Sequence, residues 1–289
     1  PEAGKRLRLL QQYFFVTCSL QDILNIHLQR AALPLSALPD KWAIQLNDTH
    51  PSIAVAELMR LLIDEHQLAW DDAWDLTVRT FGYTNHTLLP EALETWPVEL
   101  FERLLPRHLE IIYRINVQHL ALAEARAPGD IDFRASVSLI DERSGRRVRM
   151  GQLAFVGSHR INGVSAMHSD LMRETVFHDL NHLYPGRITN KTNGITFRRW
   201  LHNANPELTA LAVEAVGPGV LDDPSLLRGL DAFARDSEFV RRYAAVRRGR
   251  KEALAVIVSE RTGIDIDPSA LFDVQIKRIH EYKRQLLNI

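Results

Sequence analysis

The chain has 289 residues, of which 46% are hydrophobic and 25% charged, and its formal net charge is -1. This composition is typical of a globular protein with one large or two ordinary domains, and it excludes a disordered chain. The nearly neutral charge gives no overall attraction to nucleic acid.

The single cysteine and the first residues indicate the compartment. Because Cys18 is the only cysteine, an internal disulfide is excluded, which fits a reducing compartment. It lies in an apolar stretch and is expected to be a buried, inert thiol. Residues 1–6 contain neither an initiator methionine nor the apolar part of a signal peptide, and no apolar run approaches the roughly 18 residues of a membrane span. We therefore predict a cytoplasmic protein and interpret the chain as a piece of a longer one.

The first hundred residues predict two strand–loop–helix units. Residues 5–30 have helical spacing, with Leu7 and Phe14 on the apolar face. Residues 42–46 predict a short buried strand, and the apolar positions of residues 55–62 predict an amphipathic helix after it. A second strand is expected at 76–81, followed by a helical region.

That helical region begins at Pro90, is divided by Pro97 and Pro106, and ends in a section whose apolar face includes Leu109 and Val117. Strands alternating with helices predict the α/β class.

The next part of the chain continues this alternation. Residues 137–140 and 147–150 flank a Ser-Gly turn and predict a hairpin at the edge of the sheet. Residues 152–156 predict a third strand, and residues 164–177 a helix after it. Taken together, the pattern predicts an α/β fold with a largely parallel sheet.

The character of the chain changes near Asn193. From Asn203 onward the pattern is mostly helical until Leu271, where an apolar run predicts a new strand. A domain boundary is therefore expected in the segment 190–194. In the helical part, the basic residues 241–251 alternate with acidic ones and lack an aromatic stacking platform, which favours a solvated helix face over a nucleic-acid site.

Polar residues follow the predicted strands. Asp48, His50 and His159 each come after one, so all three could face one crevice at the carboxyl edge of the sheet. Asp48 or Ser52 could equally cap the next helix, and a lone loop histidine is more often structural. Asn193 could present its amide to a sugar or simply form a turn, and Trp200 could stack on a planar ring or lie in the core.

The C-terminal segment carries the strongest chemical signal. Lys277, Arg278 and Lys283 follow the strand-like run after Leu271, and Tyr282 lies among them. Arginine offers a fork to two phosphate oxygens, lysine a mobile positive charge, and tyrosine a neutral hydroxyl for a sugar. By spacing alone these cations could form a solvated helix face, but helical geometry does not place them all on one side. Their position after a strand favours a site for phosphate beside a sugar.

Five segments together resemble the glycogen/starch/maltodextrin phosphorylases, in order and with compatible spacing. They are Leu46 to Ser52, Tyr83 to Glu94, Leu105 to His108, Asn190 to Thr196, and Lys277 to Gln285. The resemblance covers nearly the whole chain but only the middle of the family's chain. No Walker-type glycine loop, nucleophile elbow or Cys/His metal pattern competes with it.

The resemblance implies a two-domain GT-B-type glycosyltransferase fold made of two Rossmann-like domains. Residues 1–193 would be the C-terminal part of the first domain, and residues 194–289 the beginning of the second, cofactor-binding domain. The implied activity is phosphorolysis of α-1,4-glucans by orthophosphate, giving α-glucose 1-phosphate with retention, with pyridoxal 5'-phosphate as cofactor. A homodimer is implied for the full-length protein, with no nucleic-acid or membrane partner.

The resemblance also assigns residues. The implied contacts are Arg278 and Lys283 for the substrate phosphate, Lys277 and Lys283 for the cofactor phosphate, Tyr282, Asn193 and His159 for the glucosyl unit, and Trp200 for the cofactor. The predicted crevice adds Asp48 and His50 as substrate-binding residues. Phe197 departs from the family's usual proline, which affects local rigidity.

The family's cofactor lysine lies in a glycine-rich segment expected beyond Ile289, so the chain alone is expected to be inactive. A non-catalytic carbohydrate-binding or assembly module is the alternative. A nucleotide-sugar transferase of similar architecture fits the motifs less well.

Overall fold

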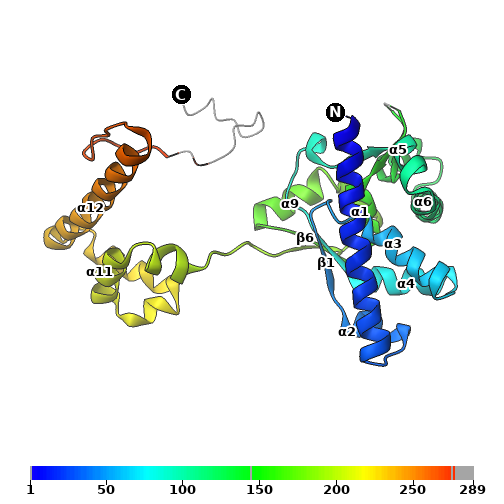
Figure 1. The fold of residues 1–289 in the computed structure, drawn as a ribbon, viewed down its shortest axis with the longest axis horizontal. Coiled ribbons are helices and arrows are strands. Elements are labelled where there is room, and N and C mark those ends of the chain that lie inside the picture. The colour runs from blue at the N-terminus through cyan, green and yellow to red at the C-terminus, as the bar shows by residue number, and fades with distance from the viewer. Residues whose placement is uncertain (1, 144, 275, 277–289) are drawn as a thin grey trace. The chain divides into compact units, whose positions relative to one another are not determined.

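The computed structural model describes residues 2–143, 145–274 and 276. The chain forms two compact units, Pro1–Asn193 and Gly194–Ile289 (Figure 1). The division falls inside the segment around Asn193 where the sequence changes character.

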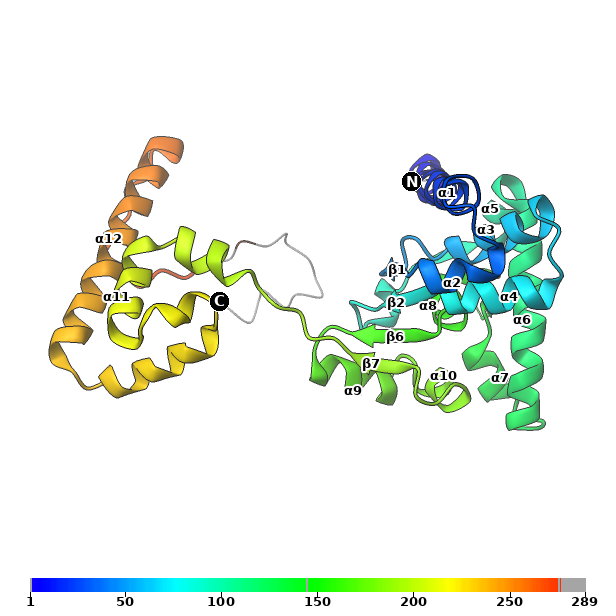
Figure 2. The ribbon, with the colours of Figure 1, turned by 90° about the horizontal axis from the view of Figure 1, so that it is seen from below.

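A four-stranded parallel sheet forms the centre of the first unit (Figure 2). Its strands are β1 (Ile44–Asn47), β2 (Phe81–Thr84), β6 (Arg160–Gly163) and β7 (Ile188–Asn190), in the order β1-β2-β6-β7. In register, Leu46 is paired with Tyr83 and Tyr83 with Ile161, and all three are buried. The predicted α/β class with a parallel sheet is confirmed.

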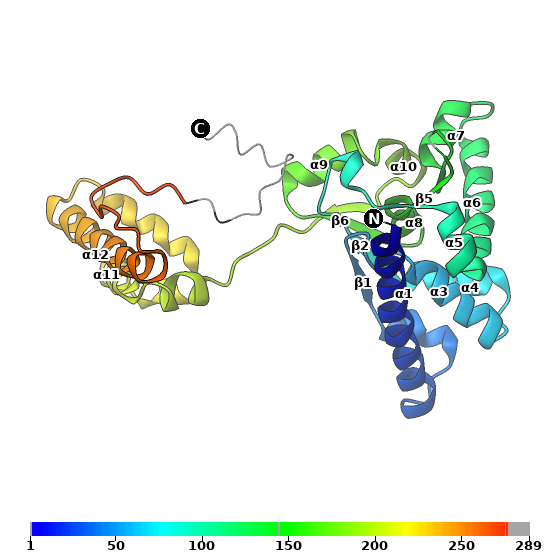
Figure 3. The ribbon, with the colours of Figure 1, turned by 45° about the horizontal axis from the view of Figure 1, so that its top comes forward.

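Helices cover this sheet (Figures 2 and 3). Their bounds are α1 (Glu2–Asn25) with its π-helical continuation η1 (Ile26–Arg30), η2 (Leu35–Ala37), α2 (Leu38–Lys41), α3 (Ala54–Arg60) with the π-helical η3 (Leu61–Glu65), α4 (Trp70–Thr80), α6 (Pro106–Arg126), α7 (Ile131–Val137), α8 (Met150–Val156), α9 (Ala166–Glu174) and α10 (His178–Leu183). Helix α3 packs against both α1 and α6. The helices expected at 5–30, 55–62 and 164–177 are therefore present.

The buried stripe of α1 differs from the predicted one. Leu9 and Val16 are buried, whereas Leu7 and Phe14 are exposed. Cys18 is also exposed, so its predicted burial was wrong. The run around Cys18 is apolar on several sides of the helix, and the contacts with α3 and α6 decide which side is covered. Val117 of α6, also predicted to lie on an apolar face, is 68% exposed.

Two predicted strands are helices. Most of the segment 76–81 belongs to α4, which buries Trp70, Ala73, Leu76 and Thr80 at helical spacing before β2 begins. The segment 152–156 lies in α8, whose apolar residues are buried on every side. A short apolar run without periodicity cannot distinguish a buried helix from a buried strand, so this pattern gave the wrong element.

A second, three-stranded antiparallel sheet has the order β3-β5-β4. The hairpin expected around Gly145 is present as β4 (Ile140–Asp141) and β5 (Arg147–Arg149). It was wrongly expected at the edge of the main sheet: β5 pairs instead with β3 (Thr95–Pro97). That strand lies in the region expected to be helical, between η4 (Pro90–Ala92) and α5 (Val98–Leu104). Pro97 ends β3 at the edge of this small sheet, a position that proline tolerates.

The second unit is helical, as expected. It contains η5 (Arg198–Asn203), α11 (Pro206–Val216), η6 (Pro218–Leu221), η7 (Pro224–Phe233) and α12 (Ser237–Thr262). Arg241 and Arg248 of α12 are exposed and pair with Glu238 and Glu252, which agrees with the predicted solvated helix face. No strand is assigned between Leu271 and Val274. A strand needs a neighbouring strand to bond, and the described residues of this unit contain none.

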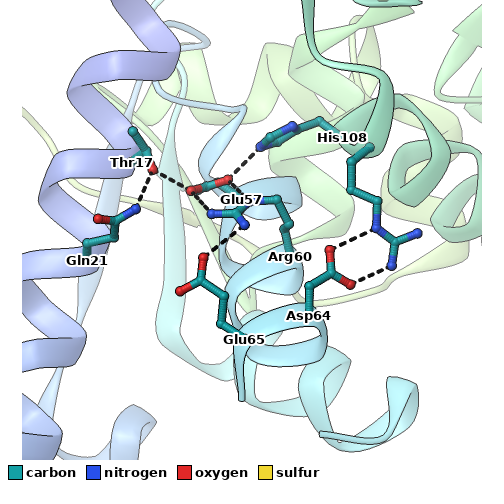
Figure 4. A network of polar contacts seen from close by, with 8 residues as sticks. Thr17, Gln21, Glu57, Arg60, Asp64, Glu65 and His108 are labelled. Atoms are coloured by element: carbon teal, nitrogen blue, oxygen red, sulfur yellow. Dashed lines mark hydrogen bonds and ion pairs between the residues drawn. The ribbon is translucent and has the colours of Figure 1, made fainter. Parts of the chain in front are cut away.

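A buried ionic network joins α1, α3 and α6 (Figure 4). Its centre is Glu57 on α3, whose side chain is fully buried. The carboxylate accepts hydrogen bonds from the Thr17 hydroxyl, from Nε of Arg60 at 2.8 Å, and from Nε2 of His108 at 2.6 Å. Burial raises the pKa of Glu57, but the hydrogen bonds from Arg60, His108 and Thr17 outweigh burial and lower it to about 2. The network therefore fixes three helices around an ionised carboxylate.

Candidate functional site

The carboxyl ends of the four parallel strands meet at one edge of the main sheet. Asn47, Thr84 and Asn190 end their strands, and Asn162 lies one residue before the end of β6. The register places Asn47 beside Thr84 and Thr84 beside Asn162. We call these four residues the polar edge. Ligands of open α/β sheets bind at such an edge.

Hydrogen bonds hold the side chains of the polar edge in fixed orientations. The Thr84 hydroxyl donates to Oδ1 of Asn162 at 2.9 Å and accepts from Nε2 of Gln45 at 3.0 Å. Nε2 of His86 lies 2.6 Å from Oδ1 of Asn47, an amide oxygen that can only accept, so this ring nitrogen carries a proton. Neutral amides and hydroxyls of this kind suit the hydroxyl groups of a sugar, because each can both donate and accept.

Asp48 follows β1 in a conformation that few residues adopt. Its φ is +63°, its backbone N–H donates to the Thr84 carbonyl at 2.9 Å, and its Oδ1 accepts from the Thr49 N–H at 2.7 Å. Aspartate tolerates this left-handed region better than most residues because its short side chain bonds locally. Strained backbone of this kind is found at functional sites more often than elsewhere. Because Asp48 directly follows β1 and bonds to the last residue of β2, it lies at the carboxyl edge, as predicted.

The alternative role of Asp48 or Ser52 as a helix cap is not supported. Helix α3 has Ile53 at its N-cap position, without a side-chain hydrogen bond. The Ser52 hydroxyl is buried and has no hydrogen-bond partner among the described residues. The polar residues after β1 are therefore not used to begin α3.

Gly163 allows α9 to approach the polar edge closely. A Cβ atom at this position would lie 2.5 Å from Oγ of Ser169 and 2.9 Å from its Cα, which is closer than real atoms approach. Because the space is open, the Ser169 hydroxyl reaches Oδ1 of Asn190 at 3.0 Å. The glycine thus fixes the last polar side chain of the edge.

Charged residues surround His50, three residues after the end of β1. Its Nδ1 lies 3.2 Å from a terminal guanidinium nitrogen of Arg8 and 3.9 Å from Oε2 of Glu94. Oε1 of Glu94 accepts from Nε2 of Gln12 at 2.8 Å, while Oε2 has no hydrogen-bond partner among the described residues. Burial raises the pKa of Glu94, and the hydrogen bond from Gln12 and the positive charge of Arg8 offset only part of this rise.

The predicted position of His159 is wrong. It precedes β6, and its backbone N–H and its Nδ1 both lie near the carbonyl of Phe81, at 3.1 and 2.7 Å, where β2 begins. His159 is therefore at the amino edge of the sheet, opposite Asp48. The error follows from the segment before it, which is helix α8 and not a strand.

The other predicted site residues lie in three places. Asn193 follows β7, is exposed, and donates its backbone N–H to the Val164 carbonyl at 2.9 Å. Trp200 lies in η5 of the second unit with 66% of its surface exposed, so it is not a core residue of the described unit. The predicted phosphate and sugar ligands of the C-terminal segment lie outside the described residues: Lys277, Arg278, Tyr282 and Lys283.

Sequence reasoning missed several members of this site. His86, Asn162 and Asn190 could have been found from the rule that polar residues at the ends of parallel strands share an edge, had the last two strands been placed correctly. Arg8 and Glu94 offered no such signal, since 86 positions separate them and only tertiary packing brings both beside His50.

The described residues contain neither a cluster of metal-ligating side chains nor a membrane-spanning helix. Within residues 2–143, 145–274 and 276, no three His, Cys, Asp or Glu side chains are grouped so as to hold a metal ion. In the same part of the chain, no helix is both long enough and apolar enough to cross a bilayer.

Comparison with known proteins gives one consistent result. A family model described as carbohydrate phosphorylase matches residues 1–289. Glycogen phosphorylase of Synechocystis sp. is 52% identical over 286 residues, which cover 99% of this chain and 34% of the relative. The human liver form of glycogen phosphorylase is 49% identical and the human muscle form 48%, with 99% of this chain covered in each. The chain spans about a third of the length of these relatives, 34% and 35% for the two human forms.

Proposed function

The chain belongs to the carbohydrate phosphorylase family, and on that premise we propose that the whole protein is an α-1,4-glucan phosphorylase. The reaction breaks the bond between C1 of the terminal glucosyl unit and the O4 of the next one. A phosphate oxygen forms a new bond to C1 with retention, and O4 takes up the proton. The products are α-glucose 1-phosphate and a glucan shorter by one unit.

The observation that carries this proposal is the polar edge, because it gives the family's chemistry a place in this chain. Its amides and hydroxyl are neutral and held in fixed orientations, as binding of a sugar requires. Asp48 and His50 lie directly beside it, and Asn193 follows the last strand. We propose that Asp48, His50 and Asn193 contact the glucan. His159 is left out, since it lies at the opposite edge.

The phosphate site is proposed on residue chemistry. Lys277, Arg278 and Lys283 supply several cations within seven positions, and Tyr282 supplies a neutral hydroxyl. Fixed cations are needed where the phosphate is to attack, because they offset negative charge that would otherwise repel a second phosphate group nearby. In this proposal Arg278 and Lys283 bind the substrate phosphate and Tyr282 the glucosyl unit.

Pyridoxal 5'-phosphate is the proposed cofactor of the whole protein. The residues present are compatible with it: Lys277 and Lys283 are suited to a phosphate group, and the exposed indole of Trp200 is accessible for contact with a planar ring. When bound, the cofactor's phosphate supplies the proton that the substrate phosphate passes on. The part of this chain is to hold both phosphates beside the sugar.

Architecture and partners complete the proposal. The parallel sheet of residues 1–193 would be the end of the first Rossmann-like domain of a GT-B fold, and residues 194–289 the start of the second. Glucan and orthophosphate are the proposed substrates. A homodimer in the cytoplasm is the proposed state of the whole protein.

Release of glucose 1-phosphate from maltodextrin by the longer protein, with pyridoxal phosphate and orthophosphate present, tests the activity. Arg278→Ala should lower kcat/KM by at least about a hundredfold, the size of effect seen when a preorganised charge contact is removed. Arg241→Ala is the matched control, because Arg241 lies on the solvated face of α12 and pairs with Glu238. A longer protein that binds maltodextrin but releases no glucose 1-phosphate would be a carbohydrate-binding module, and the enzymatic proposal would fail.

A further inference from the structure

Arg8 and Glu94 compete for the same ring nitrogen of His50, and the proposed reaction does not require this arrangement. Two groups of opposite charge face the same ring nitrogen, Nδ1. The guanidinium of Arg8, on α1, is 3.2 Å away, and the carboxyl of Glu94, in the segment before β3, is 3.9 Å away. Asp48 lies on the same loop two residues before His50, and its negative charge raises the pKa of Glu94 further.

The two neighbours demand different protonation of Nδ1. Arginine has five N–H donors and no acceptor, so a nitrogen that bonds to it must offer a lone pair. A carboxylate only accepts, so a nitrogen that bonds to it must carry a proton. Nδ1 cannot satisfy both at once. In the structure the Arg8 contact meets hydrogen-bond distance and the Glu94 contact does not.

We infer that Arg8 is a positioning residue that holds His50 in the tautomer with the lone pair on Nδ1 and the proton on Nε2. Glu94 is the competitor, and its Oε2 atom is buried without a hydrogen-bond partner among the described residues. Oε1 is held by Gln12, itself buried on α1, which keeps the carboxyl group in place beside the ring. If Arg8 is removed, the proton should therefore move to Nδ1 and bond to Oε2 of Glu94.

The consequence concerns the glucan, and this part depends on the proposed function. The His50 side chain is 57% exposed, and no described residue bonds to Nε2. With the proton on Nε2, His50 presents an N–H donor beside the polar edge, where a sugar oxygen can accept it. With the proton on Nδ1, the same position would present an acceptor. Arg8 thus determines whether Nε2 of His50 donates a hydrogen bond to the glucan or accepts one from it.

Nitrogen NMR of the 289-residue chain labelled with ¹⁵N-histidine tests this directly at slightly alkaline pH. The signals of His50 are assigned by their loss in His50→Gln. The wild-type chain should show an unprotonated Nδ1 and a protonated Nε2. Arg8→Met should exchange the two, and Arg8→Met combined with Glu94→Leu should not place the proton on Nδ1.

Arg6→Met is the matched control, since Arg6 lies two residues earlier on α1 and no contact of His50 involves it among the described residues. Circular dichroism confirms that each variant is folded. The inference is overturned if wild-type His50 carries its proton on Nδ1, or if Arg8→Met leaves the protonation as it is in Arg6→Met. Because no substrate is present, a failure of the proposed activity would leave this result standing.

Discussion

Replacing Glu57 with glutamine should destabilise the first unit by about 3 kcal/mol. The carboxylate is fully buried and accepts from Arg60, His108 and Thr17. Its pKa falls from 4.5 to about 2, and each unit corresponds to about 1.4 kcal/mol of preference for the ionised form. A glutamine of the same shape has one acceptor oxygen, and its NH₂ group would face the N–H of His108 or Arg60. Removing one member of a buried ionic network costs a similar 3–5 kcal/mol or so.

The same residue predicts a pH dependence. Since the folded pKa lies below the unfolded value of 4.5, the stabilisation is complete above that value and is lost as the pH falls towards about 2. At pH 3 about 2 kcal/mol of it should be gone. Urea unfolding followed by circular dichroism at pH 7 and pH 3 measures the difference between wild type and Glu57→Gln.

Glu65→Gln is the control for this experiment, because it removes an exposed partner of the same Arg60. The Glu65 side chain is 48% exposed, so its loss should cost no more than about 1 kcal/mol. The reasoning is refuted if the two variants unfold at the same urea concentration, or if the difference between wild type and Glu57→Gln is the same at pH 3 as at pH 7.

Three further expectations concern single residues. Gly163→Ala should displace α9, because the new Cβ would lie 2.9 Å from the Cα of Ser169; we expect a loss of about 1–3 kcal/mol in urea unfolding, and an unchanged midpoint would contradict it. Asp48→Ala should cost about 1 kcal/mol or more and Asp48→Gly less, since only glycine adopts a φ of +63° without a steric cost; equal melting temperatures of the two variants would argue against strain there. Burial, opposed by its bond to the Val137 carbonyl, lowers the pKa of His119 from 6.5 to about 4, so stability should fall as the pH drops from about 6.5 towards 4; a His119 NMR signal that titrates near pH 6.5 would disprove this.

The sequence by itself determined the features that depend on local patterns. The structure contains the features that were predicted from local patterns: the helices at 5–30 and 55–62, the hairpin turn at Gly145 and the helices after Asn203. Each of these depends on residues a few positions apart, so the information lies within a short window. The five family motifs added the phosphorylase resemblance, which the comparisons confirm.

Tertiary structure decided what short windows leave open. The apolar run 152–156 is equally compatible with a helix and a strand. Because it forms helix α8, His159 lies at the amino edge of the sheet and not at the predicted carboxyl edge. The neighbours of His50 come from α1, 42 positions away, and from the segment before β3, and no local pattern links them. The charge around a polar residue depends on side chains distant in sequence, because only the packed fold brings a buried carboxyl and a guanidinium to the same ring nitrogen.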